Sequence, residues 1–198
     1  MASRDLWLTH PRIKAAAEQQ LGKVERKPTS AYTRLQNAIA YNGKWAMDRV
    51  DFDTDTGRLG WTFIGVDLIG TNTLLRCHQA KVNKYREQWK ERTAALILQN
   101  QNKVRRWCEQ AKYPVRYEAF YVTRHRVLMD EDNLIGAAKV VLDEIVRQSA
   151  IPDDTPDFVR HPLVESRRGT LGALHLVLLP LEKAMITTAT RRWAETIN

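Results

Sequence analysis

Apolar residues recur along the chain with the two periods that are typical of helices and strands. Between residues 79 and 112 they fall close to every 3.6 positions, which predicts one long amphipathic helix or two in series. The apolar positions of this segment are Val82, Tyr85, Trp89, Leu96, Val104 and Trp107. The same period predicts a helix from about Asp132 to Ser149.

Alternating apolar and polar residues predict strands over 61–70, 113–127, 158–166 and 171–180. Turn formers crowd residues 51–60 (DFDTDTGRLG) and 166–169 (SRRG). Further helices are expected over 11–22, 30–48 and 181–195. Strands and helices mix without strict alternation, so we expect an α+β fold in which helices pack on a compact mixed sheet.

Two parts of the chain are expected. Residues 1–60 match no pattern with an evident role and are expected to form a helical N-terminal extension. Residues 61–198 would form the main domain, closed by a polar C-terminal helix.

Composition narrows the function classes. Lys and Arg number 31 against 23 Asp and Glu, a net charge of +8, and a basic chain suits a polyanion such as nucleic acid. Charge alone leaves this open, because many basic proteins bind no nucleic acid. No apolar run reaches the roughly 18–20 residues of a membrane span, and the N-terminus has no apolar signal-peptide core. Cys77 and Cys108 belong to no C-x-x-C pair, which favours reduced cysteines in a cytoplasmic protein.

Acidic residues gather at both ends of the helix in MDEDNLIGAAKVVLDEIVRQSAIPDD, residues 129–154. Asp130 and Asp132 precede it, and Asp153 and Asp154 follow it in a turn begun by Pro152. Carboxylate oxygens are the ligands that Mg²⁺ prefers, and Mg²⁺ supports phosphodiester hydrolysis. A straight helix of some 18 residues is about 27 Å long, which would hold the two clusters apart. Ordinary helix termination, with Asp132 as N-cap and PDDTPD as a turn, is the alternative interpretation.

This stretch resembles the pattern of RusA-type Holliday-junction resolvases: D-x-D-N, then K-x-x-x-D within a helix, then a D-D pair. The matching residues are Asp130, Asp132, Asn133, Lys139, Asp143, Asp153 and Asp154. GTNTLLRCHQAKVNKYREQW is similar to an upstream family segment, so the resemblance covers residues 61–180. The chain departs from the pattern in two places. Lys139 lies seven rather than four residues after Asp132, and Met129 stands where a basic residue is frequent.

The resemblance implies a homodimeric nuclease that cuts branched DNA with Mg²⁺, for which Mn²⁺ can substitute, and without a small-molecule cofactor. It implies that Asp130, Asp132 and Asp154 ligate the metal, leaving Asp153 and Glu131 open as further ligands. Lys139 would contact the scissile phosphate. Carboxylates from both subunits would meet near a shared groove. The expected DNA phosphate contacts are Arg76, Lys81, Lys84, Arg124, Arg126, Arg167 and Arg168.

The function expected from these observations is Holliday-junction resolution by a metal-dependent endonuclease, a hydrolase of DNA recombination, repair or phage replication, in the cytoplasm of a bacterial or phage-infected cell. One alternative is a DNA-binding accessory protein that keeps the fold without cleavage, and another is a basic protein-interaction module. Of the histidines, His175 is expected in the core, whereas His78 and His125 could line a DNA groove. DFDTDTG departs from the calcium-loop pattern and is expected to be a turn.

Overall fold

The computed structural model describes residues 30–42, 48–148 and 150–181. The chain from Ala31 onward forms one compact unit built on a five-stranded sheet with the order β1-β2-β5-β3-β4. The parallel pair β3 and β4 joins antiparallel neighbours, so the sheet is mixed and the predicted α+β class is confirmed. The strands are β1 (Arg49–Asp53), β2 (Arg58–Ile64), β3 (Val115–Thr123), β4 (Val159–Arg168) and β5 (Ala173–Pro180).

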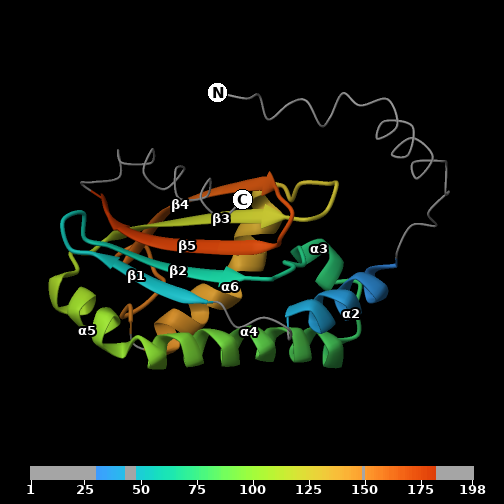
Figure 1. The fold of residues 1–198 in the computed structure, drawn as a ribbon, viewed down its shortest axis with the longest axis horizontal. Helices are drawn as coiled ribbons and strands as arrows, with labels where there is room; N and C mark the ends of the chain where they lie inside the picture. Colours follow the sequence, from blue (N-terminus) through green and yellow to red (C-terminus); the bar gives the residue numbers. More distant parts are fainter. Residues whose placement is uncertain (1–29, 43–47, 149, 182–198) are drawn as a thin grey trace, which may run out of the picture. The chain divides into compact units, whose positions relative to one another are not determined.

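Helices α4 and α6 run along one face of this sheet (Figure 1) and contact each other. The described helices are α2 (Ala31–Asn42), α3 (Thr71–Leu74), α4 (Gln79–Gln99), α5 (Gln101–Gln110) and α6 (Glu131–Arg147). The helical segment after residue 79 divides at Asn100, so it is two helices in series.

The predicted apolar face of α4 and α5 forms the core beneath the sheet. All six of its predicted positions are buried. Trp89 packs edge to face against Phe63 of β2, with ring centroids 5.4 Å apart. Trp107 donates its indole N–H to the carbonyl of Gly57, which has a φ of 68° in the turn between β1 and β2. His175 is buried as predicted, and its Nδ1 lies 3.1 Å from Thr62 Oγ1.

Several element boundaries differ from the sequence predictions. Residues 51–60 are not one long turn, because β1 and β2 pair as a hairpin around Asp53–Arg58. Strand β4 continues through Arg168, so most of the predicted SRRG turn is strand. Residues 31–60 belong to the same compact unit as the rest of the sheet, whereas the sequence suggested a boundary at residue 60.

Some predictions lie outside the described residues, namely the helices over 11–22 and 181–195 and the last part of the one over 30–48. Within residues 30–42, 48–148 and 150–181, no helix is both long and apolar enough to cross a membrane.

The strand predicted over 61–70 ends at Ile64, because the backbone of residues 65–69 is held by groups other than a sheet partner. The amides of Gly65 and Val66 both donate to the Gly172 carbonyl, at 2.8 and 3.1 Å. The Leu68 and Ile69 amides donate to the Tyr121 and Tyr85 hydroxyls. This segment, residues 65–70, is therefore fixed although it is irregular.

Asp67 lies in the middle of segment 65–70. Its amide donates to Asn42 Oδ1 at 2.7 Å, and its carbonyl accepts from Asn42 Nδ2 at 3.3 Å. Gly172 makes the close approach possible, since a Cβ there would lie 1.9 Å from the Val66 carbonyl oxygen. The Asn42 side chain thus holds both the amide and the carbonyl of Asp67.

Candidate functional site

The site begins at the start of α6, where Asp130 caps the helix. Its backbone is extended, and its carboxylate accepts the Asn133 amide N–H at 2.9 Å. The side-chain amide of Asn133 donates to both oxygens of the same carboxylate, at 2.9 Å each. These hydrogen bonds, the backbone one foremost, lower the pKa of Asp130 below its ordinary value. The cap is therefore Asp130, and the alternative interpretation of Asp132 as N-cap is wrong.

Asn133 also joins α6 to α3. Its Oδ1 accepts the backbone N–H of Asn72 at 3.3 Å, while its NH₂ group holds Asp130. A Cβ on Gly70 would lie 2.8 Å from that Oδ1, so glycine allows the close contact. The asparagine of the D-x-D-N pattern thus orients the first aspartate and anchors α3.

Asp132 differs from Asp130 in having no partner among the residues that the structure describes. Its side chain is exposed, and no described residue forms a hydrogen bond or ion pair with it. Glu131 beside it is exposed as well. We call Asp130, Asp132 and Asn133 the amino end of α6. It presents carboxylates at the positive end of a helix, where negative charge is favoured.

A second group of charges lies along the same helix and contains Lys139, Asp143 and Asp154, which we call the lysine cluster. Lys139 Nζ lies 2.9 Å from Asp143 Oδ1 and 2.5 Å from Asp154 Oδ2. The chain after α6 folds back, so Asp154 contacts the middle of the helix rather than its far end. The expected separation of about 27 Å between the two acidic groups is therefore wrong, since Lys139 lies only about 10 Å along the axis from Asp132.

Protonation in the lysine cluster follows from these contacts. The hydrogen bond to Asp154, followed by the one to Asp143, raises the pKa of Lys139 above its ordinary value. Lys139 in turn lowers the pKa of Asp154. Both groups are consequently charged at neutral pH, and Lys139 is suited to stabilise negative charge rather than to accept a proton.

The carboxylates at the amino end of α6 are suitable donors for a hard cation, because Mg²⁺ is commonly bound by one or two carboxylates together with waters and substrate phosphate. Asp130 and Asp132 provide two. In the part of the chain that the structure describes, no three Asp, Glu, His or Cys side chains gather as a metal shell. Asp154 is bonded to Lys139, and Asp153 Oδ1 accepts the Asp154 amide N–H at 2.7 Å. The four predicted metal ligands are thus not brought together within one chain.

Four of the predicted DNA-binding residues lie at the same end of the sheet as the amino end of α6. Arg124 and Arg126 belong to the β3–α6 loop, residues 124–130, which ends at Asp130, the N-cap of α6. Arg167 and Arg168 lie beside Val122 and Thr123 in the parallel register of β4 and β3. The Met129 amide donates to Ser166 Oγ, which ties the loop to β4. Arg167 also forms an ion pair with Glu165, at 2.7 Å.

The other three predicted DNA-binding residues, Arg76, Lys81 and Lys84, lie between the end of α3 and the second turn of α4. Lys81 Nζ lies 6.0 Å from the ring centroid of Tyr32. His78 is the N-cap of α4, where its Nδ1 accepts the Ala80 amide N–H. Basic residues thus lie on two segments that adjoin the amino end of α6, namely the β3–α6 loop and the stretch that follows α3.

A cavity of about 580 Å³ is lined by residues of α3, α4 and α6. Lys139 and Asp143 line it from α6, and Arg86 and Lys90 line it from α4. The lysine cluster therefore faces a hollow that carries charges of both signs, open to a polar ligand.

Asp67 was missed at the sequence level, although it contacts two residues that the sequence did single out, Arg124 and His125. The Asp67 side chain is only 3% exposed, and it forms an ion pair with Arg124 of the β3–α6 loop at 2.7 Å. His125 Nε2 lies 3.2 Å from the same carboxylate. The available signal was a single acid in the otherwise apolar run WTFIGVDLIG, residues 61–70.

Comparison with known proteins gives no family assignment. A scan of the chain against protein-family models finds no match. A search of curated proteins likewise finds no similar sequence. The RusA-type resemblance therefore stays a prediction from the quoted residues.

Proposed function

We propose that the protein is a metal-dependent endonuclease that resolves four-way DNA junctions or other branched DNA, as a homodimer, within the cytoplasm of a bacterial or phage-infected cell. The observation that carries the proposal is the arrangement along α6. Asp130 is oriented by Asn133, Asp132 is exposed without a partner among the described residues, and a charged lysine lies two turns further on. Basic residues lie on the neighbouring segments, which suits a phosphate backbone.

Each residue has a role that its surroundings support. Asp130 and Asp132 would hold Mg²⁺ or Mn²⁺, which neutralises phosphate charge and lowers the pKa of a bound water. Lys139 would stabilise the negative charge that develops on the phosphate as the P–O bond to the leaving strand breaks. Asp154 and Asp143 hold the Lys139 ammonium group in place, and a DNA phosphate would compete with them for it.

A homodimer would supply the carboxylates that one chain does not gather. A second subunit can bring its own acids to a shared groove, and two symmetric sites would cut two strands of a four-way junction. Light scattering of the purified protein tests this part of the proposal. A mass of twice 22.9 kDa is expected.

The nuclease proposal is tested with a labelled synthetic four-way junction and Mg²⁺ or Mn²⁺. Paired nicks are expected with metal and none with EDTA, and linear duplex of the same sequence should be cut far less. Asp132→Asn should lose the nicks, whereas Glu91→Gln, which removes an exposed acid on α4, should keep them. Junctions left intact by the wild-type protein with every metal would contradict the nuclease.

A second candidate is a DNA-binding accessory protein with the same fold and no cleavage. It is favoured by the ion pair of Asp154 with Lys139, which occupies one of the predicted metal ligands. A gel shift without metal, run beside the nicking assay, separates the candidates. Binding of junction DNA without cleavage in any metal supports the accessory protein.

A further inference from the structure

Two largely buried carboxylates, Asp48 and Asp67, each bind an arginine through two of its nitrogens, and the two arginines differ in how exposed they are. Asp48 binds Arg92, whose remaining donors go to the carbonyls of Asn42 and Ile64. Arg92 is 13% exposed and is used entirely within the protein. That pair joins α2, β1, β2 and α4, as a structural contact does.

The Asp67–Arg124 pair instead leaves its arginine at the surface. Arg124 Nε lies 3.2 Å from both Asp67 oxygens and Nη2 lies 2.7 Å from Oδ2, while Nη1 has no partner among the described residues. The side chain is 36% exposed. One face of the guanidinium lies over the Tyr41 ring, 4.0 Å from its centroid. The group is thus held in one orientation with donors still available.

His125 shares this carboxylate. Its Nε2 lies 3.2 Å from Asp67 Oδ1, and its side chain is 56% exposed. Its backbone N–H donates to Thr123 Oγ1, which fixes the start of the β3–α6 loop. Asp67 therefore places two nitrogen-bearing side chains next to each other, five and six residues before Asp130.

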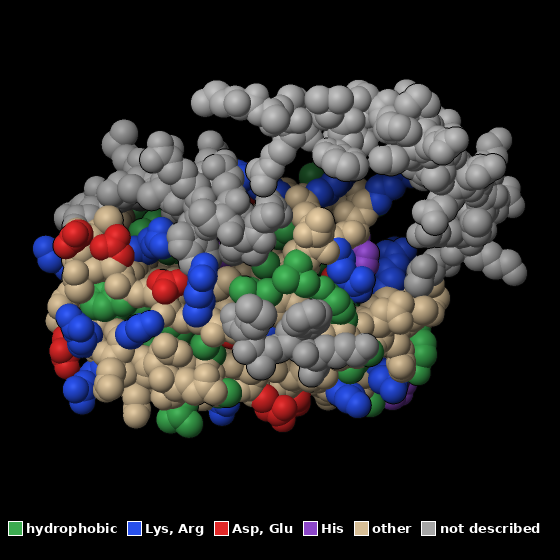
Figure 2. All heavy atoms as spheres, in the orientation of Figure 1, with side chains coloured by type: hydrophobic (Ala, Val, Ile, Leu, Met, Phe, Trp, Pro, Cys, Tyr) green, Lys and Arg blue, Asp and Glu red, His purple; other side chains and the backbone are tan. Residues whose placement is uncertain are grey.

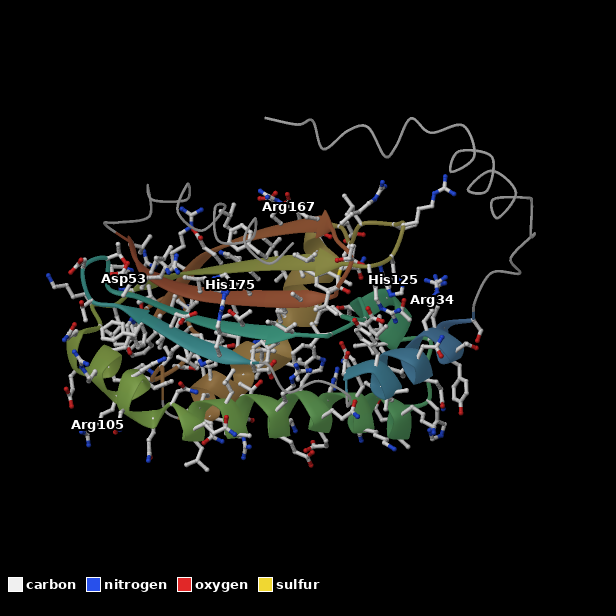
Figure 3. The ribbon with its side chains drawn as sticks, in the orientation of Figure 1. Arg34, Asp53, Arg105, His125, Arg167 and His175 are labelled. Carbon is white, nitrogen blue, oxygen red and sulfur yellow. The ribbon has the colours of Figure 1, made fainter. Side chains whose placement is uncertain are left out.

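The surroundings of this pair are basic. Arg126 follows in the same loop and is exposed, and Arg34 is exposed on α2. Arg34 lies seven residues before Tyr41 and so on the same stripe of that helix. Figure 3 shows Arg34 and His125 at the same end of the unit, and Figure 2 shows blue side chains around a histidine at that place. An anion would meet several cations here.

We propose that Asp67 is a positioning residue that holds Arg124 and His125 as a clamp for one DNA backbone phosphate beside the amino end of α6. A buried carboxylate is costly unless it is paired, and it is well suited to fix the planar guanidinium fork for a phosphate. The inference rests on the proposed function in that the phosphate belongs to the DNA that is cut. Asp67 itself contacts no substrate.

For Asp67→Asn, the change in net charge and the loss of the clamp predict opposite effects on DNA affinity. Asp67→Asn raises the net charge by one, which alone would strengthen DNA binding. Loss of the clamp predicts the reverse, namely affinity about threefold to tenfold lower and a slope of log K against log salt that is smaller by about one.

The experiment measures the affinity of the full-length protein for a fluorescent four-way junction without metal, at several salt concentrations. Asp48→Asn is the matched control, since it adds the same charge and breaks a bidentate pair with Arg92, which itself contacts the same Asn42. It should bind as tightly as wild type, or slightly more tightly. Thermal melting of both variants measures how much each loses in stability when its carboxylate–arginine pair is broken.

A second variant keeps the test decisive if Asp67→Asn does not fold. Arg124→Lys retains the charge but loses the fork, and it should weaken binding to a similar extent. Where both single variants fold, the double variant should bind no more weakly than Arg124→Lys alone, because both changes remove the same contact.

The outcomes separate this inference from the proposed function. Weaker binding by Asp67→Asn and Arg124→Lys, with Asp48→Asn unchanged, supports the clamp even if no junction is cut. Binding by Asp67→Asn or Arg124→Lys that equals or exceeds that of the wild type overturns the clamp and leaves the nuclease proposal standing. A wild-type protein that binds no DNA at low salt overturns both.

Discussion

The amino end of α6 and the lysine cluster lie on one helix, yet their charges are balanced in different ways. At the amino end, Asp130 receives three hydrogen bonds from Asn133, and Asp132 has no partner among the described residues. In the lysine cluster, one ammonium group is shared by Asp143 and Asp154. The first group contains two negative charges and no cation, whereas the second contains one cation for two carboxylates.

This difference indicates what each group can do. Uncompensated carboxylates on a basic surface would repel DNA unless a cation lay between them, so the amino end of α6 is where a metal has most to contribute. The lysine cluster already contains its cation and needs no metal to be stable. It can instead offer Lys139 to a phosphate.

The largest effect is expected from Asp132→Asn. Removing the unpartnered charge should lower the junction-cleavage rate by roughly 100-fold or more, the order expected when one electrostatic contact to the transition state is lost. The melting temperature should fall only slightly, because the side chain is exposed and bonds to nothing described, and the lost charge at the helix start contributes at most about 1 kcal/mol. Single-turnover cleavage and thermal melting measure the two effects. Retained cleavage would refute a catalytic role for the amino end of α6.

Asp130 allows charge and capping to be separated. Asp130→Asn should lose cleavage to a similar extent while keeping the cap, since Asn caps helices as well as Asp does. Asp130→Ala should lose cleavage and also melt at a lower temperature, because the Asn133 amide N–H loses its acceptor. Equal melting temperatures for the two variants would show that the cap contributes little.

In the lysine cluster, Lys139→Met should lower cleavage by roughly tenfold to 100-fold, since the cation at the phosphate is lost. Lys139→Arg retains charge and should recover part of the rate. Both should fold, because exposed ion pairs contribute at most about 1 kcal/mol. The affinity for Mn²⁺, measured by titration, should be unchanged in both variants. A lower affinity would show that the lysine cluster and the amino end of α6 form one metal site.

Gly172→Ala should destabilise the fold at segment 65–70, which carries Asp67. The added Cβ would lie 1.9 Å from the Val66 carbonyl oxygen, so segment 65–70 must shift. Overpacking of this kind costs about 1–3 kcal/mol of unfolding free energy. Urea unfolding measures that loss, and a variant as stable as wild type would contradict the close packing of segment 65–70.

The smallest effect concerns pH. The folded-state pKa of Asp154 is below its ordinary value of 3.8, so its pairing stabilises the fold above that value and is lost as pH falls through the lowered pKa. The stability difference between wild type and Lys139→Met should therefore be at most about 1 kcal/mol at pH 7 and shrink below about pH 4. Urea unfolding at several pH values measures this difference, and one that grows in acid would contradict the ion pair.

The sequence predicted much of this structure where the relevant signal is local. Periodicity located α4, α5 and α6, and the D-x-D-N pattern marked the start of α6. Strand β1 and the first three residues of β2 were missed, because the turn formers of residues 51–60 concealed them. Local spacing could not show that Asp154 returns to Lys139, since that contact depends on how residues 148–154 fold back.

Asp67 and Arg124 are 57 residues apart, and nothing in the pattern joins them. They meet because segment 65–70 leaves the sheet at Ile64 and is fixed by Gly172, Asn42 and two tyrosines. Contacts of this kind are set by tertiary packing, which the binary pattern of apolar and polar residues does not encode.

The most direct test of the central claim is anomalous diffraction from crystals of the protein grown with Mn²⁺ and junction DNA. The account predicts a manganese peak coordinated by Asp130 and Asp132, next to a DNA phosphate that Lys139 approaches. DNA bound at this surface with no manganese at these carboxylates, or with manganese bound elsewhere, would contradict it.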